Sequence, residues 1–139
     1  MAVSLGQRPT VVLVDDHPGI LTAVREIVQK EFEVLAAMND SGAAIDIIHD
    51  YRPDIVVLDI AMPHMNGFEA ARCLRKAGLG AKIVFLTVTE DIDYARAARE
   101  IGASYIVKRR MHVDLILAIK EALAGRPFYS PIPPDGVPS

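Results

Sequence analysis

The stretch IVVLDIAMPHMNG at residues 55–67 decides the fold, because it ends a continuous apolar run on a carboxylate. The run IVVL contains only β-branched residues and leucine, which is typical of a parallel strand covered by helices on both faces. Asp59 follows this run directly, and Pro63 and Gly67 then favour a turn. We therefore expect a buried strand that delivers Asp59 to the edge of a sheet.

Four more short apolar runs occur along the chain, and longer segments with a helical period separate them. This alternation predicts an α/β fold in which five βα units build a parallel sheet. The run FEVLAA is the weakest of the set, so we expect it nearer an edge of the sheet. The runs are VVLV at residues 11–14, FEVLAA at 32–37, KIVFL at 82–86 and SYIV at 104–107.

Residue types also predict where the helices begin and end. Pro18 suits the first turn of the first helix, with Asp16 or His17 as its cap, and Ser41 opens the second helix. The third, fourth and fifth helices end at Gly78, Gly102 and Gly125. The stripe of the fifth helix is traced by Val113, Ile116, Ile119, Lys120 and Leu123.

Polar side chains stand directly after four of the five predicted strands. Asp15 and Asp16 follow the first strand, Asp59 the third, Thr87 the fourth and Lys108 the fifth. In open α/β sheets, ligands bind outside the carboxyl ends of the strands. The topology is therefore expected to bring these side chains together at one edge, and this edge is the candidate site.

The residue types at this edge suit a cation and a phosphoryl group. Three carboxylates held close together repel one another, so they either take up protons or bind a cation. Oxygen ligands favour a hard ion such as Mg²⁺. Lys108 and Thr87 offer donors to phosphoryl oxygens. Asp59, alone on its strand, is the candidate nucleophile that would form an aspartyl phosphate.

The chain resembles the receiver domain of two-component response regulators over roughly residues 10–125. The segments that carry the resemblance are VDDH, DIAMPHMNG with Pro63 and Gly67, LTVT with Thr87, and YIVK with Tyr105 and Lys108. Their order and their positions at strand ends are together highly specific. The resemblance implies one flavodoxin-like domain, a doubly wound parallel sheet with strand order 2-1-3-4-5.

The resemblance also implies a role for each acidic residue. Asp59 would accept a phosphoryl group from a histidine kinase or a small donor. Asp16, Asp59 and the backbone carbonyl of Ala61 would hold Mg²⁺, and Asp15 would support the ion through water. Such a chain is a phosphoacceptor switch rather than an enzyme, and at most it phosphorylates itself from small donors and removes its own phosphate.

The expected switch involves Thr87 and Tyr105. In the family that the chain resembles, the threonine moves toward the phosphate and the tyrosine turns inward, which remodels the surface around the last two strands and the fourth helix. Such a change is a population shift driven by new charge-assisted contacts. From its alternation with apolar neighbours alone, Tyr105 is about as readily a core residue as a switch.

One departure from the family pattern concerns the residue after Lys108. The family often has proline there, whereas this chain has Arg109 and Arg110, which we expect to be solvated. A cis Lys108–Arg109 bond would cost about 3 kcal/mol, whereas a trans bond could shift Lys108 away from the phosphate, so the sequence leaves the geometry of this peptide open. Receivers of LuxR-type transcription factors often lack this proline, and GRPFYSP at residues 125–131 resembles their join to a DNA-binding domain.

Domain boundaries follow from changes in composition. We expect an N-terminal extension at residues 1–9, the receiver at 10–125 and a linker or tail at 126–139, where five prolines occur without an apolar period. The net charge of −3 gives no general reason to bind nucleic acid, so DNA contact would belong to a separate output domain.

The compartment is predicted from what the sequence lacks. The single cysteine, Cys73, excludes an intrachain disulfide framework. The first ten residues do not resemble a signal peptide, and no apolar run is long enough to cross a bilayer. A cytoplasmic protein without membrane contact is therefore expected.

Two other functions are alternatives to the signalling receiver. An aspartyl-phosphate phosphatase usually has a second aspartate two residues after the nucleophile, but Ala61 stands there, so the sequence argues against this function. A pseudo-receiver or stand-alone receiver would act only as a protein interaction module. The LuxR-type resemblance further predicts a homodimer on phosphorylation, through either the first and fifth helices or the fourth helix.

Overall fold

A computed structural model describes residues 8–132 of the 139-residue chain. Its strands agree with the predicted apolar runs to within one residue at either end. In chain order the elements are β1 (Thr10–Val14), α1 (Pro18–Val28), β2 (Glu33–Met38), α2 (Ser41–Tyr51), β3 (Ile55–Asp59), α3 (Gly67–Lys76), β4 (Lys82–Thr87), α4 (Ile92–Glu100), β5 (Ser104–Val107), a 3-10 turn (Lys108–Arg110) and α5 (Met111–Leu123).

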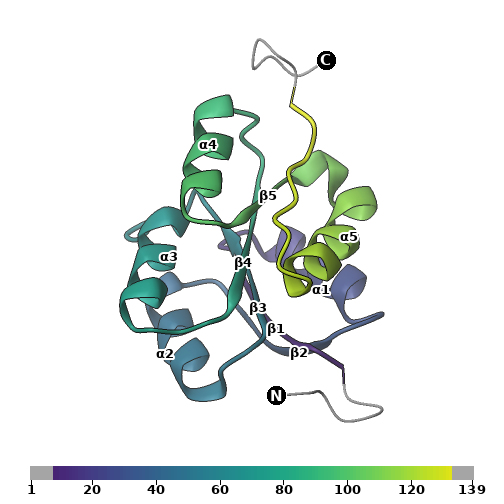
Figure 1. The fold of residues 1–139 in the computed structure, drawn as a ribbon. Coiled ribbons are helices and arrows are strands. Elements are labelled where there is room, and N and C mark those ends of the chain that lie inside the picture. The colour runs from purple at the N-terminus through teal and green to yellow at the C-terminus, as the bar shows by residue number, and fades with distance from the viewer. Residues whose placement is uncertain (1–7, 133–139) are drawn as a thin grey trace.

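The five strands form one parallel sheet in the order β2-β1-β3-β4-β5, which confirms the predicted doubly wound fold. Helices α1 and α5 cover one face of the sheet, and α2, α3 and α4 cover the other (Figure 1). Strand β3 is buried along its whole length, whereas β2 is only partly buried, as expected for an edge strand. All strand carboxyl ends therefore face one edge of the sheet.

The loop after β1 is fixed by two side chains that bond to backbone. His17 caps α1, because its Nδ1 accepts a hydrogen bond from the Ile20 amide at 3.3 Å. Asp15 Oδ1 accepts the amide of His17 at 2.9 Å. Of the two predicted caps, His17 is the one that the structure uses, and Asp16 remains exposed beside the sheet edge.

The buried face of α5 differs from the predicted stripe. Val113 is 69% exposed and Leu123 is also exposed, so these two residues do not face the core. Apolar residues lie all round this helix, and its period alone could not fix which side packs against the sheet. The residues that face the core are Met111, Leu115, Ala118, Ile119 and Ala122.

The first part of the predicted linker packs against the domain. The Tyr105 amide donates to the Phe128 carbonyl, and the Ser130 amide donates to the Tyr105 carbonyl, both at 2.8 Å. This extended segment runs parallel to β5 and lies next to α5 (Figure 1). The remainder of the predicted tail, residues 133–139, and most of the predicted N-terminal extension, residues 1–7, lie outside the described residues. The domain boundary at residue 125 stays a prediction.

Within residues 8–132, no helix combines the length and the apolar character that a membrane span requires.

Candidate functional site

Three carboxylates meet at the carboxyl edge of the sheet. Asp15 and Asp16 follow β1, and Asp59 ends the neighbouring strand β3. One carboxylate oxygen from each residue lies within 4.8 Å of the other two. Asp15 and Asp59 are buried, whereas Asp16 is exposed. The predicted acidic cluster therefore exists, and its exposed member leaves it open to solvent.

Lys108 reaches the same cluster from the end of β5. Its Nζ lies 2.8 Å from Asp15 Oδ2 and 3.5 Å from Asp59 Oδ2, and its side chain is only 8% exposed. No peptide bond in the described part of the chain is cis, so the Lys108–Arg109 bond is trans. This trans bond leaves the Lys108 ammonium at the acids, because the 3-10 turn that begins at Lys108 directs it there.

The surroundings of Asp59 make its negative charge costly. Burial raises the pKa of Asp59 to about 6, and repulsion from Asp15 adds to this effect. Lys108 and the Ala61 amide, which donates to Asp59 Oδ1 at 3.3 Å, oppose the rise. At Asp59, burial and repulsion therefore outweigh the nearby positive charge of Lys108.

Gly67 brings α3 against the backbone at Asp59. A Cβ atom on residue 67 would lie 2.4 Å from the Asp59 carbonyl oxygen and 2.8 Å from the Ile60 Cα. The Gly67 amide donates to the Ile60 carbonyl at 2.9 Å, which closes the loop of residues 60–67. The sequence indicated a turn residue here, and the structural requirement is the close approach of two backbones.

Thr87 and Tyr105 both bond to the loop of residues 88–91, which follows β4. Both side chains are buried. The Thr87 hydroxyl accepts the Thr89 amide at 3.2 Å, and the Tyr105 hydroxyl donates to the Thr89 carbonyl. Burial raises the pKa of Tyr105 to about 12, so the phenol remains a neutral donor. Both predicted switch residues therefore form hydrogen bonds to the same loop.

Arg109 and Arg110, which were expected to be solvated, are partly exposed, and each also forms an ion pair. Arg109 donates through Nε and Nη2 to both oxygens of Glu90, each at 2.7 Å. Arg110 donates to both oxygens of Asp114, at 2.8 and 3.2 Å. The four-residue spacing of Arg110 and Asp114 could have predicted their ion pair, because side chains four residues apart on a helix lie next to each other. Glu90 lies 19 residues from Arg109, and no sequence pattern connects them.

The acidic cluster suits a hard cation. Asp15 Oδ2 is buried, contacts the Lys108 ammonium, and accepts no well-directed hydrogen bond from the part of the chain that the structure describes. Carboxylate oxygens are the ligands that Mg²⁺ prefers, and the exposed side of the cluster leaves room for water ligands. The residues present therefore fit such an ion.

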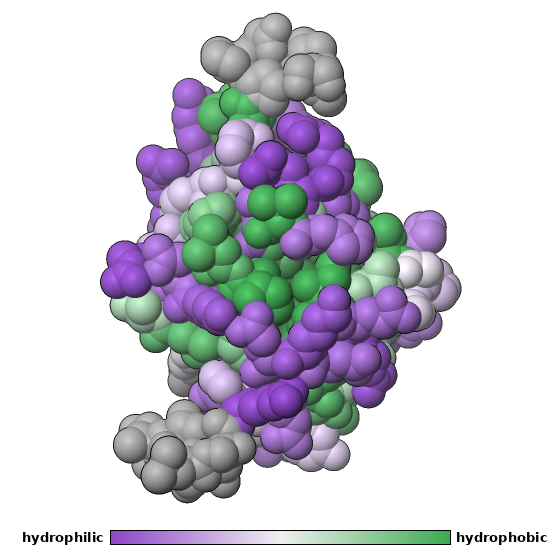
Figure 2. Space-filling view, turned by 90° about the vertical axis from the view of Figure 1, so that its right-hand side faces the viewer, coloured by the Kyte–Doolittle hydropathy of each residue, from purple (hydrophilic) through white to green (hydrophobic). Residues whose placement is uncertain are grey.

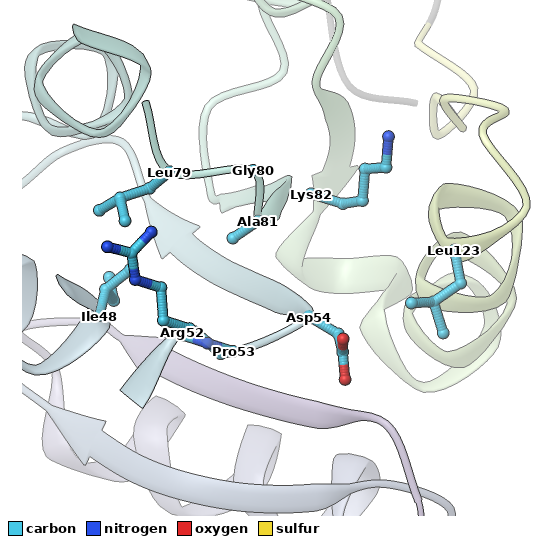
Figure 3. A pocket seen from close by; sticks show the side chains of 9 residues that line it. All are labelled: Ile48, Arg52, Pro53, Asp54, Leu79, Gly80, Ala81, Lys82 and Leu123. Carbon is cyan, nitrogen blue, oxygen red and sulfur yellow. The ribbon is translucent and has the colours of Figure 1, made fainter. Parts of the chain in front are cut away.

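A separate hollow lies away from this edge. It has a volume of about 390 Å³ and lies at the opposite end of the sheet, beside the starts of β3 and β4 (Figure 3). Its acidic residue, Asp54, already accepts two hydrogen bonds from Thr10. Arg52 and Lys82 also line it, but it contains no acidic cluster. The acidic cluster and its lysine therefore make the carboxyl edge the candidate functional site, rather than this hollow.

A doubly wound sheet with three acids and a lysine at its carboxyl edge defines the class of phosphoacceptor switches. The chain belongs to the response regulator receiver domain family, whose sequence model matches residues 11–120. It is therefore a two-component signalling domain rather than a catalytic enzyme. The acidic cluster of Asp15, Asp16 and Asp59 is typical of the Mg²⁺ site of this family, and membership implies a histidine kinase partner.

The matched relatives are regulators of the LuxR and NarL type. The DNA-binding transcriptional activator EvgA of Escherichia coli is 28% identical over 86% of this chain and 59% of its own length. The nitrate/nitrite response regulator protein NarL of Escherichia coli is 31% identical over 87% of this chain and 57% of its own. The chain thus spans between half and two thirds of these relatives.

A solved structure of similar length shows the same fold. The LuxR-family two-component response regulator from Aurantimonas is 34% identical, with a TM-score of 0.84, and the match covers 90% of this chain and 91% of the other.

Proposed function

We propose that this chain takes a phosphoryl group from a histidine kinase onto Asp59 and switches its surface to control an output. The observation that carries this proposal is the burial of Asp59 beside Asp15, within 3.5 Å of the Lys108 ammonium, at the carboxyl edge of the sheet. An Asp59 oxygen would attack phosphorus, the phosphorus–nitrogen bond of the donor histidine would break, and the imidazole would keep the electron pair.

Each neighbour of Asp59 has a proposed task. Asp16, Asp59 and the carbonyl of Ala61 would hold Mg²⁺, with Asp15 supporting it through water. The ion would supply positive charge that offsets the carboxylates and the phosphoryl oxygens. Lys108 would turn from Asp15 toward a phosphoryl oxygen, which is a short movement because its ammonium already contacts both acids.

The proposed switch runs through the loop of residues 88–91. A phosphoryl group on Asp59 would offer the Thr87 hydroxyl a charged acceptor, whereas this hydroxyl now accepts the Thr89 amide. The Tyr105 hydroxyl donates to the carbonyl of the same Thr89, so a change at Thr87 would also alter the hydrogen bond between Tyr105 and the loop. The new contacts would thereby shift the populations of two loop arrangements.

We further propose that the output is transcription, through a DNA-binding domain that these residues do not contain. The names of the matched regulators EvgA and NarL, and the partial coverage of both, support this assignment. Phosphorylation by a histidine kinase would place the domain in the cytoplasm.

Intact mass spectrometry tests the phosphoacceptor role. Incubation with acetyl phosphate and Mg²⁺ is expected to add one phosphoryl group to the protein and none to Asp59→Asn. If the folded wild-type protein gains no mass and also fails to bind beryllofluoride with Mg²⁺, the phosphoacceptor role is excluded. The chain would then be a pseudo-receiver that acts through protein contacts alone.

A further inference from the structure

A C-terminal segment of this chain, residues 127–131, extends the sheet beyond β5, and we call it the strap. Its backbone exchanges two hydrogen bonds with Tyr105, through the Phe128 carbonyl and the Ser130 amide, each at 2.8 Å. The Phe128 amide also donates to the Ser104 hydroxyl at 3.0 Å. These bonds pair both backbone polar groups of Tyr105, so the strap is a part of the folded domain.

The strap contributes Ser130 to a partly buried polar network, which we call the latch and which consists of Arg110, Asp114 and Ser130. The Ser130 hydroxyl donates to Asp114 Oδ2 at 2.7 Å and accepts the Val107 amide at 3.2 Å. Asp114 is 3% exposed and Ser130 is 4% exposed. Burial raises the pKa of Asp114, but the bonds from Arg110 and Ser130 outweigh it and hold this pKa below its ordinary value. The carboxylate is therefore buried, charged and fully partnered.

The latch and the acidic cluster meet at one short turn. Lys108 begins the 3-10 turn that Arg110 ends, and Val107, which precedes it, bonds to Ser130. No side chain caps this turn, and 3-10 hydrogen bonds have poorer geometry than those of an α-helix. The position of the turn consequently depends on the ion pairs and hydrogen bonds that its side chains make.

We infer that the latch is a positioning device for Lys108: it holds the turn from the side of α5, so that the Lys108 ammonium stays at the acidic cluster. The inference rests on the proposed function for the chemistry of its ligand, a phosphoryl group. Arg110, Asp114 and Ser130 do not touch that group themselves. By reciprocity, a phosphoryl analogue at Asp59 stabilises the docked strap by the same factor.

Two affinities of the Ser130→Ala protein separate this role from a purely structural one. Loss of the hydroxyl releases the turn, so the affinity for beryllofluoride in excess Mg²⁺ is expected to fall about 3- to 10-fold. The affinity for Mg²⁺ alone is expected to stay constant or to rise, because the Lys108 ammonium competes with a cation at the acids. A general loosening of the fold would weaken both affinities.

Two matched variants complete the set. Ser130→Thr keeps the hydroxyl and is expected to restore beryllofluoride affinity. Glu121→Gln breaks the exposed Arg126–Glu121 ion pair just before the strap without touching the latch, and it is expected to leave both affinities unchanged.

Amide hydrogen exchange of the wild-type protein tests the inference without any variant. Beryllofluoride with Mg²⁺ is expected to slow exchange at the Tyr105 and Ser130 amides, which form the strap's bonds. In metal-free protein, Ser130→Ala is expected to speed exchange at the same two amides.

The outcomes distinguish this inference from the proposed function. Failure of the wild-type protein to bind beryllofluoride would overturn the proposed function. Binding by the wild type, with equal affinity in Ser130→Ala and unchanged exchange at Tyr105 and Ser130, would overturn the inference alone.

Discussion

The carboxyl group of Asp59 is buried beside a second carboxylate, and this position has a cost in stability. Its pKa is about 6 in the folded protein, against 3.8 for an ordinary aspartate. Between about pH 4 and pH 6 the folded state therefore binds more protons at this residue than the unfolded state does. Its contribution to the free energy of unfolding falls as the pH rises through this window, and stays low above it.

Replacement of Asp59 by asparagine should reverse this cost. In metal-free protein at pH 7.5 we expect Asp59→Asn to raise the free energy of unfolding by about 1–3 kcal/mol. Urea unfolding with a chelator, repeated from pH 4 to pH 8, measures the difference between the two proteins. The difference should grow between pH 4 and pH 6. A variant equal to or less stable than the wild type at pH 7.5 would contradict the expectation.

Gly67 permits a second test at the level of a single residue. A methyl group at this position would overlap the Asp59 carbonyl and the Ile60 Cα. Because the obstacle is backbone, we expect Gly67→Ala to lower the free energy of unfolding by about 2–3 kcal/mol. Gly80→Ala is the matched control, since no atom lies within 4 Å of its added Cβ, and it should have little effect. Equal stability of the two variants would rule out the close approach.

The sequence predicted that the acidic residues and Lys108 meet at one edge of the sheet, because their place at strand ends follows directly from the order of strands and helices. It predicted less about Arg109, whose partner Glu90 stands on a different loop. Neither residue has a pattern that indicates the other. Their contact depends on how the loops after β4 and β5 pack, and this is a property of the folded chain.

Among the elements, the loop of residues 88–91 connects the site to the surface. The Tyr105 hydroxyl donates to Thr89 and accepts the Asp91 amide at 3.5 Å, and the Arg109–Glu90 pair holds the loop from outside. The loop is therefore tied to β5 and to the turn that carries Lys108. Such ties allow a small change at the site to alter a larger surface.

Removal of the tyrosine hydroxyl should loosen this loop selectively. Tyr105→Phe keeps the buried ring but leaves the Thr89 carbonyl without its donor, so we expect a loss of about 1 kcal/mol in the free energy of unfolding. Amide exchange should become faster at Thr89 and Asp91 and stay unchanged in β1 and β3. Uniformly faster exchange across the sheet would show that the hydroxyl serves overall stability instead.

Strands and helices were predictable because apolar period and glycine position reflect local physics. The buried side of α5 could not be predicted, because apolar residues occur on all sides of this helix. The docking of the strap could not be predicted either, since a proline-rich segment without an apolar period reads as a linker. Its attachment depends on the hydroxyl of Ser130 and the carboxylate of Asp114, two polar residues that come together only in the fold.

At the scale of the whole molecule, the side with α1 and α5 carries exposed apolar surface, with green side chains at the centre of the view and hydrophilic ones around them (Figure 2). Three large apolar side chains of α5 are exposed, Val113, Leu117 and Leu123, whereas α4 has one, Ile92. Exposed apolar side chains of this kind suit contact with another protein surface. Of the two faces that the sequence left open, we predict that a phosphorylation-dependent dimer uses the α1 and α5 face.

Light scattering with matched charge substitutions tests this face. Val113→Lys should keep the protein monomeric in beryllofluoride and Mg²⁺, because a dimer would bury the charge. Ile92→Lys, on α4, should still permit a dimer. A dimer that survives Val113→Lys and is lost in Ile92→Lys would assign the interface to α4.

The most direct test of the central claim is to map the phosphorylated residue. After acetyl phosphate treatment with Mg²⁺, borohydride reduction converts an aspartyl phosphate to homoserine, which peptide mass spectrometry then locates. We predict homoserine at position 59 alone, with much less product in Lys108→Ala. Product at Asp15 or Asp16, or none in folded wild-type protein, would contradict the assignment of Asp59 as the phosphoacceptor.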